Sequence, residues 1–446
     1  MTAQPPIRVA IIGAGAAGMA AAARCLQMPA DRIIVTVLEK GETFGGCWSH
    51  RENMYDSLRT NLPCELMRFD DLPFESSSSR SFVTLHQVGE YLERYAEAHG
   101  IRKFTRFGCT VENVSRRQSA PEFEVTYSDE SSRRRSEMFD SVVVASGHFN
   151  DELIPSSLLD QANRWRGRIL HSKHYRKPGA YKDQTVMVVG AKSSGTDIAH
   201  DISGEAAAVF VADRYCLDSK GSVLDANAEF IPQNLTWAKG LAELVPESNS
   251  VLMEDGEQID NIDAIIFATG YLYRFPFLDD TCNSPIVDGK FLKLAYQLIH
   301  PDFPRLFFIG MPFGVVPFPL FDIQAEFIAR ALCGAVEMPS ARERKRSADE
   351  HEERLRKCGI GRAHYLADQW AYCEEVAALA GRDIHDPQFR RILDMRKKVY
   401  HDVSKRRPKV PGAHPEYREL TYAIDYESGN AKVSCGGDAI AHLAVT

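Results

Sequence analysis

The chain has 446 residues, a formal net charge of -8 and a pI near 6.0. This length predicts two or three domains with buried cores, and the acidic balance argues against a general nucleic-acid or anionic-membrane binder. The local basic runs Arg133–Arg135 and Lys405–Arg407 stand among acidic or polar residues, so we interpret them as solvated faces.

Cysteine usage and apolar runs predict the compartment. The ten cysteines form neither a CxxC pair nor a Cys/His ligand spacing, so we expect no disulfide framework and no metal site. The apolar run Val9–Ile12 is too short for a signal-peptide core, and no run approaches the roughly 18 residues of a membrane span. The sequence therefore predicts a soluble, cytoplasmic chain in a reducing compartment.

The N-terminal elements predict a dinucleotide-binding β-α-β unit. Residues 7–12 form a buried strand, followed by a glycine turn, an Ala-rich helix and a second strand that ends before Glu39. In the turn, Gly13 permits the bend, Gly15 lets the backbone approach a pyrophosphate, and Gly18 lets helix and strand pack closely. Glu39 lies 21 residues after Gly18, where a carboxylate accepts hydrogen bonds from an unphosphorylated ribose. The unit is therefore predicted to bind FAD or NAD.

Further along, residues 84–99 predict an amphipathic helix in which Thr84 and Gln87 can form a capping box. Residues 122–127 and 138–145 predict a β-hairpin. The turn Gly45-Gly46-Cys47-Trp48 can pass close to the pyrophosphate or ribityl chain of a flavin, although a surface turn with a packed Trp is the alternative.

A second β-α start follows later in the chain. Residues 185–189 predict a strand, and Gly190-Ala-Lys-Ser-Ser-Gly195 turns into a helix with hydroxyl donors near its N-terminus. After the strand Ala208–Ala212, Arg214 can hold a 2′-phosphate and select NADPH. Asp213 beside it would repel that phosphate or accept the free ribose hydroxyls of NADH, so the choice of coenzyme stays open.

The remaining segments carry less pattern. Residues 215–250 are predicted to be irregular, Ile262–Phe267 is predicted as a strand, and Leu306–Ile309 as a strand that re-enters the first domain. From about residue 340 the pattern is helical and charged, and after about residue 410 we expect an extended or partly ordered tail.

A motif with wide spacing lies between the two starts: Trp165-x-Gly167-x-x-x-His171-x-x-x-Tyr175. We interpret it as an interdomain connection in which Gly167 turns the chain and a neutral His171 hydrogen-bonds to backbone without touching substrate.

Together these features resemble the flavin-containing monooxygenases, a family of class B flavoproteins with two dinucleotide-binding domains. The resemblance covers roughly residues 7–335. Its motifs match at Gly13–Gly18, Glu39, Gly45–Trp48, Tyr55–Pro63, Asp71–Phe74, Gly147-His148, the 165–175 motif, Gly190–Asp197, Ala268–Tyr271 and Phe318–Gln324. Trp165 stands where Phe is usual. Tyr175 is similar to the N- and S-oxygenating branch, and the sequences around 55–74 and 316–324 are similar to those of the soluble plant glucosinolate S-oxygenases and insect pyrrolizidine-alkaloid N-oxygenases.

The resemblance implies an α/β fold with two Rossmann-like domains in a disulfide-reductase-like arrangement. We expect residues 1–155 and 276–335 to bind FAD, residues 156–275 to form an inserted NADPH-binding domain, and residues 336–446 to form a helical C-terminal extension and tail. It also implies a reaction: NADPH reduces FAD, oxygen gives a C4a-hydroperoxyflavin, and a soft amine or sulfide takes one oxygen atom. A homodimer is a family-level expectation.

The resemblance assigns residues to this chemistry. Asn61 matches a catalytic asparagine beside the flavin and the bound nicotinamide, where its amide can donate to a peroxide oxygen. The candidate FAD contacts are Gly13, Ala14, Gly15, Ala16, Ala17, Gly18, Glu39, Lys40, Gly46, Cys47, Trp48, Arg59, Thr60, Asn61, Leu62 and Gln324. The candidate NADPH contacts are Gly190, Lys192, Ser193, Ser194, Gly195, Thr196, Asp197 and Arg214.

Other functions stay open on sequence alone. An NADPH oxidase that releases hydrogen peroxide or a Baeyer–Villiger monooxygenase would use the same cofactors, and a redox-sensing nucleotide binder would use them without turnover. A disulfide reductase is disfavoured, because Cys47 has no cysteine neighbour until Cys64.

Overall fold

The computed structural model describes residues 5–49, 54–75, 80–214, 232–287, 289, 291–357, 364, 366, 368–407 and 416–444. Its first parallel sheet has the strand order β20-β7-β1-β2-β3. These strands are β1 (Ile7–Ile12), β2 (Ile33–Leu38), β3 (Thr105–Arg106), β7 (Ser141–Val144) and β20 (Leu306–Phe308). The predicted return of the chain near residue 306 is confirmed, because β20 pairs in parallel with β7.

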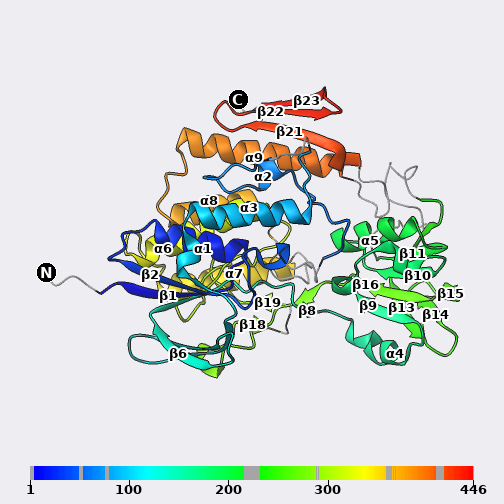
Figure 1. Ribbon diagram of the computed structural model, residues 1–446, viewed down its shortest axis with the longest axis horizontal. Coiled ribbons are helices and arrows are strands. Elements are labelled where there is room, and N and C mark those ends of the chain that lie inside the picture. The colour runs from blue at the N-terminus through cyan, green and yellow to red at the C-terminus, as the bar shows by residue number, and fades with distance from the viewer. Residues whose placement is uncertain are drawn as a thin grey trace.

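The second parallel sheet repeats this arrangement, with the order β12-β11-β10-β16-β9. Its strands are β9 (Arg168–His171), β10 (Thr185–Val189), β11 (Ala208–Ala212), β12 (Leu235–Ala238) and β16 (Ala264–Phe267). The helix α5 (Ser193–Ser203) follows β10. In Figure 1 this sheet and α5 lie to the right of the first sheet. The predicted fold class, α/β with two Rossmann-like domains, is confirmed.

Each parallel sheet carries a small antiparallel sheet between two of its strands, β4-β5-β6 between β3 and β7 in the first and β13-β14-β15 between β12 and β16 in the second. A two-stranded ribbon of β8 and β17 forms where the chain passes between the two large sheets. These strands are β4 (Thr110–Arg116), β5 (Phe123–Ser128), β6 (Arg134–Phe139), β8 (Asp151–Glu152), β13 (Leu241–Val245), β14 (Ser250–Met253), β15 (Gln258–Ile259) and β17 (Tyr271–Leu272). Strands β18 (Ile286–Val287) and β19 (Phe291–Leu292) form another hairpin.

Two local predictions need correction. The predicted hairpin exists as β5 paired with β6, but residues 141–144 leave it and join the first parallel sheet as β7, because Val142, Val143 and Val144 are fully buried there. The region 215–250 was predicted to be irregular, which is wrong for β12 and β13. Residues 215–231 of that region lie outside the described residues.

Helices cover one face of the first sheet and the antiparallel β4–β6 sheet covers the other. Helix α1 (Ala16–Leu26) packs against α6 (Pro317–Leu332). Helix α3 (Leu85–Ala98) begins with the predicted capping box between Thr84 and Gln87, which is confirmed. The shorter helices are α2 (Cys64–Met67) and α4 (Leu159–Arg164).

The C-terminal extension is helical as predicted, with α7 (Ala341–Lys357), α8 (Gln369–Leu379) and α9 (Pro387–Arg406). The tail after about residue 410 was predicted to be extended or partly ordered, and its described part is extended but forms an ordered sheet. A 3-10 turn, η9 (Glu416–Glu419), leads into a three-stranded antiparallel sheet of β21 (Leu420–Asp425), β22 (Asn430–Cys435) and β23 (Asp438–Ala444). This sheet lies on α9 at the top of Figure 1, where Tyr422 and Val433 join the core of the first domain. Within the described chain, no helix is long and apolar enough to cross a membrane.

Candidate functional site: two dinucleotide turns

The first glycine turn joins β1 to α1 at the carboxyl end of the first sheet. Gly13 has φ +104°, and a Cβ there would lie 2.6 Å from the carbonyl oxygen of Ala145. A Cβ on Gly18 would lie 2.0 Å from the Gly13 carbonyl oxygen. Neither position has room for a side chain, so these two glycines are required by the fold itself. The positive φ of Gly13 agrees with its predicted role in the bend, and the close contact at Gly18 agrees with its predicted role in packing.

Gly15 has a different reason to be glycine. It is the N-cap of α1 with φ -72° and ψ 178°, a conformation open to any residue. A Cβ there would lie 3.6 Å from the Cα of Gly46, and a Cβ on Gly46 would lie 3.0 Å from the Cα of Gly15. The turn Gly46–Trp48, a 3-10 turn labelled η1, therefore lies against the first turn, and the amide of Gly45 donates to the Ala14 carbonyl at 3.1 Å.

The N-terminus of α1 fits a pyrophosphate. No side chain caps the helix, and its first turn contains no acidic residue. Backbone N–H groups of this first turn, from Ala16 and Ala17 onward, are the donors that such a helix end offers to an anion. The cradle between the two turns has no side chain of its own, since Gly15 and Gly46 face each other across it.

Glu39 anchors the first turn from the end of β2. Its buried carboxylate accepts hydrogen bonds from the amide of Ala14 at 2.6 Å and the amide of Gly41 at 2.7 Å. An ionised carboxylate can accept about four hydrogen bonds, so capacity for ribose hydroxyls remains. Lys40, its neighbour in sequence, is exposed.

The second turn, between β10 and α5, repeats the first in detail. Gly190 has φ +100° and a Cβ there would lie 2.7 Å from the Ala268 carbonyl oxygen, while a Cβ on Gly195 would lie 1.8 Å from the Gly190 oxygen. Asp213 accepts a hydrogen bond from the amide of Ala191 at 3.1 Å, which is the bond that Glu39 accepts in the first turn. Helix α5 also lacks a side-chain cap and an acidic residue in its first turn. A second dinucleotide therefore fits here.

Lys192 occupies the middle position of the second turn with φ -83° and ψ -173°, nearly the conformation of Gly15. The side chain costs no backbone strain, and its ammonium lies 5.6 Å from the ring centre of Phe313 in the first domain. A cation at this position favours an anionic ligand. The backbone of the second turn is therefore kept although its middle residue is not glycine.

The other predicted NADPH contacts divide into two groups. Ser193 and Ser194 begin α5 at the turn, whereas the hydroxyl of Thr196 donates to the Lys192 carbonyl oxygen at 3.0 Å within the helix. Asp197 accepts from the hydroxyl of Tyr55 at 2.9 Å and from the guanidinium of Arg418 at 2.8 Å, so its carboxylate is bound to these side chains.

Arg214 follows β11 and is paired with Glu254 at 2.6 Å. The two side chains are 65% and 37% exposed, so the pair is solvent-screened and can open for a phosphate.

A second cation, Arg407, lies at this turn, although the basic run 405–407 was predicted to form a solvated face. Arg407, at the end of α9, donates to the hydroxyl of Ser193 at 2.9 Å. The interpretation of that basic run was wrong for Arg407, and no local pattern in α9 points to a partner so distant in sequence.

The segment Arg59–Leu62 lies beside the start of α3. The amide of Thr60 donates to the Val83 carbonyl at 2.9 Å, and the Thr60 hydroxyl accepts from the Val83 amide at 3.1 Å. Asn61 is half-buried. A Cβ on Gly89 of α3 would lie 3.3 Å from the carbonyl oxygen of Trp48, so α3 links this segment to the η1 turn that contains Cys47 and Trp48. Asn61 is thereby held on the same side of the first domain as the first turn.

Gln324 lies apart from both turns. Its side chain is fully buried in α6, where the oxygen accepts from the Gly310 amide at 3.0 Å and the nitrogen donates to the Tyr372 hydroxyl at 2.6 Å. Gly310 lies against the turn, because a Cβ there would meet the Cβ of Ala17 at 3.0 Å. Gln324 therefore supports the first turn indirectly: it binds the Gly310 amide, and Gly310 in turn lies against Ala17.

The motif between the two starts has the structural role that its sequence predicts. Burial lowers the pKa of His171, and the neutral ring donates to the Gly270 carbonyl at 3.0 Å while accepting from the Lys173 amide at 3.2 Å. A Cβ on Gly167 would lie 2.5 Å from the Asp263 carbonyl oxygen. The prediction of a neutral, backbone-bonded His171 is confirmed.

Thiol chemistry has no support at the first turn. Burial raises the pKa of the Cys47 thiol to about 11, so it stays protonated at neutral pH. Cys47 and Cys64 are both free thiols.

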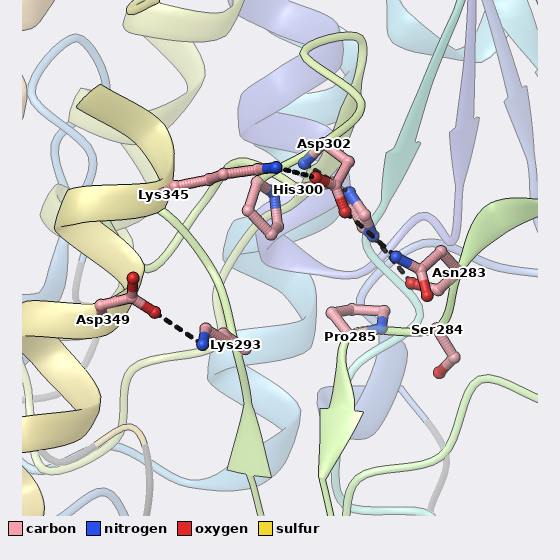
Figure 2. A pocket seen from close by; sticks show the side chains of 9 residues that line it. Asn283, Ser284, Pro285, Lys293, His300, Asp302, Lys345 and Asp349 are labelled. Atoms are coloured by element: carbon pink, nitrogen blue, oxygen red, sulfur yellow. Dashed lines mark hydrogen bonds and ion pairs between the residues drawn. The ribbon is translucent and has the colours of Figure 1, made fainter. Parts of the chain in front are cut away.

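A cavity of about 400 Å³ lies between the segment 283–302 and helix α7, and none of the predicted cofactor contacts lines it. Figure 2 shows its two lysines paired with carboxylates, Lys345 with Asp302 at 3.2 Å and Lys293 with Asp349 at 2.6 Å.

Two equivalent turns at the carboxyl ends of two parallel sheets define an oxidoreductase of the two-dinucleotide class. The family described as flavin-binding monooxygenase-like matches residues 6–225 and 235–392. The chain belongs to this family, and it is accordingly a flavoprotein monooxygenase with FAD and NADPH as cofactors.

Relatives and solved structures agree with that family. The chain is 33% identical to "Flavin-containing monooxygenase FMO GS-OX-like 4" of Arabidopsis thaliana, over 75% of this chain and 78% of that protein. It is similar to S-allyl-L-cysteine S-oxygenase from Allium sativum, with a TM-score of 0.81, 28% identity and coverage of 94% of this chain and 96% of that one. Tmm from Pelagibacter sp. strain HTCC7211 shares the fold, with a TM-score of 0.77, 23% identity and 95% of each chain covered.

Proposed function

We propose that this monooxygenase transfers one oxygen atom from O2 to a soft nitrogen or sulfur centre of a small molecule, with NADPH as the reductant. The similarity to an S-oxygenase across nearly the whole chain supports the sulfur part of this proposal. The carrying observation is that Asn61 directly follows Thr60, which two hydrogen bonds fix to Val83 before α3, on a segment that also reaches the second domain through Tyr55.

The bound flavin, once reduced, supplies the oxygen-activating chemistry. The chain's own residues bind and orient. Backbone donors of the first turn bind the FAD pyrophosphate, and Glu39 accepts from the ribose. The turn of Lys192 binds the NADPH pyrophosphate, and Arg214 holds the 2′-phosphate after leaving Glu254. The Asn61 carboxamide, with two donors and one acceptor, orients a polar atom at the reacting centre.

This proposal assigns FAD binding to residues 1–155 and 276–335, NADPH binding to 156–275, and a covering role to 336–446. It places the enzyme in the cytoplasm, where its free thiols stay reduced. Asp213 keeps some affinity for NADH, because its carboxylate lies at the position that accepts ribose hydroxyls in the first turn.

A substrate panel tests the proposal. Tertiary amines, thioethers and a cyclic ketone are offered to the purified enzyme, and NADPH oxidation, oxide formation by mass detection and hydrogen peroxide are measured together. The expected result is a sulfoxide or N-oxide in amounts close to the NADPH consumed. Peroxide alone would favour an NADPH oxidase, and a lactone would favour a Baeyer–Villiger enzyme.

The Asn61→Ser variant tests the residue assignment. It should keep its flavin and its NADPH oxidation while oxide formation falls by about 10²-fold or more, the usual loss for one oriented polar group in an active site. Unchanged oxide formation would remove Asn61 from the proposed machinery. Asn234→Ser is the control, because the Asn234 amide donates to the backbone carbonyls of Ser203 and Ala206 beside the second sheet.

A further inference from the structure

Three separate parts of the chain meet at the carboxylate of Asp197. One Asp197 oxygen, Oδ2, accepts from the hydroxyl of Tyr55 at 2.9 Å and from the guanidinium of Arg418 at 2.8 Å. Asp197 belongs to α5 of the second domain, Tyr55 to the segment between η1 and α2, with its side chain in the core of the second domain, and Arg418 to η9 of the C-terminal extension. We call these three residues the Asp197 clasp.

The clasp is buried. The side chains of Arg418 and Asp197 are 9% and 14% exposed, so the ion pair is shielded from water far more than a surface pair. Burial, followed by the nearby Asp197 carboxylate, raises the pKa of Tyr55 well above its ordinary value, so its hydroxyl stays protonated and donates. Breaking either bond leaves a buried polar group without a partner, which is costly.

On the second domain, the clasp is close to the nucleotide turn. Asp197 lies four residues after Ser193, the first residue of α5. Four residues of an α-helix span about 6 Å, so a shift of the helix N-terminus on binding an anion moves the carboxylate with it. The Ser193 hydroxyl is itself held by Arg407, from the same C-terminal extension.

On the first domain, the clasp is continuous with Asn61. From Tyr55 the chain runs through Asp56, whose amide donates to the Arg176 carbonyl of the second domain at 2.9 Å. Four residues later Thr60 is fixed to Val83 by two hydrogen bonds, and Asn61 follows. The segment 55–61 is therefore a short strap, tied to the second domain at one end and to the first domain at the other.

The C-terminal extension holds both ends of this strap. Arg418 binds Asp197, and the preceding Tyr417 packs edge-on against Phe82, with ring centres 5.2 Å apart. Phe82 is fully buried and directly precedes Val83, the partner of Thr60. The 3-10 turn η9 thus contacts the second domain through one residue and the anchor of Asn61 through the next.

We propose that Tyr55, Asp197 and Arg418 are positioning residues that couple occupancy of the second dinucleotide turn to the placement of Asn61. The inference rests on the proposed function for its catalytic consequence. When the coenzyme binds at α5, the clasp holds the strap and keeps Asn61 at the reacting centre. When the clasp is broken, Asn61 is placed less accurately, and the reduced O2 leaves as hydrogen peroxide instead of giving one oxygen atom to the substrate and the other to water.

Amide hydrogen exchange of the segment 54–62 tests the coupling without any turnover. In the FAD-loaded enzyme, NADP⁺ should slow exchange of this segment. The Tyr55→Phe variant removes a single oxygen atom, so the fold is kept, and it should bind NADP⁺ while losing about fivefold of that added protection, as expected for one buried hydrogen bond. Arg418→Lys keeps the charge and should lose less than Arg418→Met.

The chain offers a matched control on the same helix. The Tyr175 hydroxyl donates to Asp201 of α5 at 2.6 Å in a part-buried bond within the second domain, and the Phe variant keeps the contact of this ring with the Tyr55 ring, whose centres lie 5.9 Å apart. Tyr175→Phe should lower stability as Tyr55→Phe does, yet leave the NADP⁺-dependent protection of the strap unchanged. With a sulfide substrate, Tyr55→Phe should raise the fraction of NADPH recovered as peroxide by about fivefold, and Tyr175→Phe should not.

The outcomes separate the two proposals. If no product forms with any enzyme but NADP⁺ protects the strap only when Tyr55 is intact, the oxygenase proposal fails and the coupling stands. If Tyr55→Phe and Tyr175→Phe lose the same protection, or if NADP⁺ never protects residues 54–62 in the unaltered enzyme, the coupling is refuted.

Discussion

The substitution Gly15→Ala should remove FAD without unfolding the protein. Gly15 has an ordinary φ of -72°, and an added Cβ would make only van der Waals contact, with the Cα of Gly46 at 3.6 Å. Ala at such a position restricts the unfolded chain and changes stability by less than about 1 kcal/mol. The methyl group would, however, fill the cradle between the two turns, where the pyrophosphate must approach the backbone.

The loss of affinity follows from the hydrogen bonds that a displaced pyrophosphate cannot make. Two charge-assisted bonds to backbone donors are worth about 3–6 kcal/mol together, so the Kd for FAD should rise about 10²- to 10⁴-fold. In the unaltered protein, FAD at one hundred times its Kd should add about 2.7 kcal/mol to the free energy of unfolding. The variant should lose that gain.

The assay compares flavin absorbance per protein and thermal unfolding with and without FAD. Gly204→Ala is the matched control, because Gly204 has φ -70° and its added Cβ would lie 3.6 Å from the Asp201 carbonyl oxygen, away from both turns. Apoprotein of both variants should unfold near the same temperature. If the Gly15 variant purifies with a full complement of flavin and an unchanged Kd, the cradle does not hold the pyrophosphate.

Three further outcomes are expected. Glu254→Gln frees Arg214 from a solvent-screened pair and should raise the ratio of kcat/KM for NADPH to that for NADH by about two- to fivefold; a ratio that stays constant would show that the pair does not compete with phosphate. Arg407→Gln should raise the KM for NADPH about tenfold with unchanged flavin content, and an unaltered KM would leave the cation outside the site. Gly195→Ala, whose Cβ would lie 1.8 Å from a backbone oxygen, should lower the unfolding temperature sharply, whereas Gly179→Ala, with no atom within 4 Å, should not.

Much of the fold could be predicted because its cues are local. The strand at 7–12, the capping box at Thr84 and the glycine turns each follow from neighbouring residues. The missed C-terminal sheet also carried a local cue. In β21 the buried residues Leu420 and Tyr422 alternate with Thr421 and the exposed Ala423, and Gly429 precedes the next strand, a pattern of strand and turn that is typical of a half-buried hairpin.

The candidate site could be predicted less completely than the fold, because some of its contacts join residues that are far apart in the sequence. The sequence predicts that Gly190 to Asp197 form one nucleotide-binding segment, and helical geometry limits how many of those residues can face the turn. Asp197 lies more than one turn of helix after Ser193, so its side chain is directed along the helix flank toward Tyr55. Arg407 and Arg418 reach the same helix from more than 200 positions away in the sequence. No spacing rule predicts contacts of that range.

The two turns also separate the uses of glycine that a GxGxxG pattern combines. Gly13 and Gly190 are fixed by positive φ and by a facing carbonyl, and Gly18 and Gly195 by contact with the turn below them. The middle position has neither constraint, and Lys192 adopts nearly the backbone conformation of Gly15 there. A middle glycine is therefore required by how closely the ligand approaches, not by the fold. The first turn faces a second glycine turn at Gly46, so the space between the two turns is bounded by bare backbone on both sides.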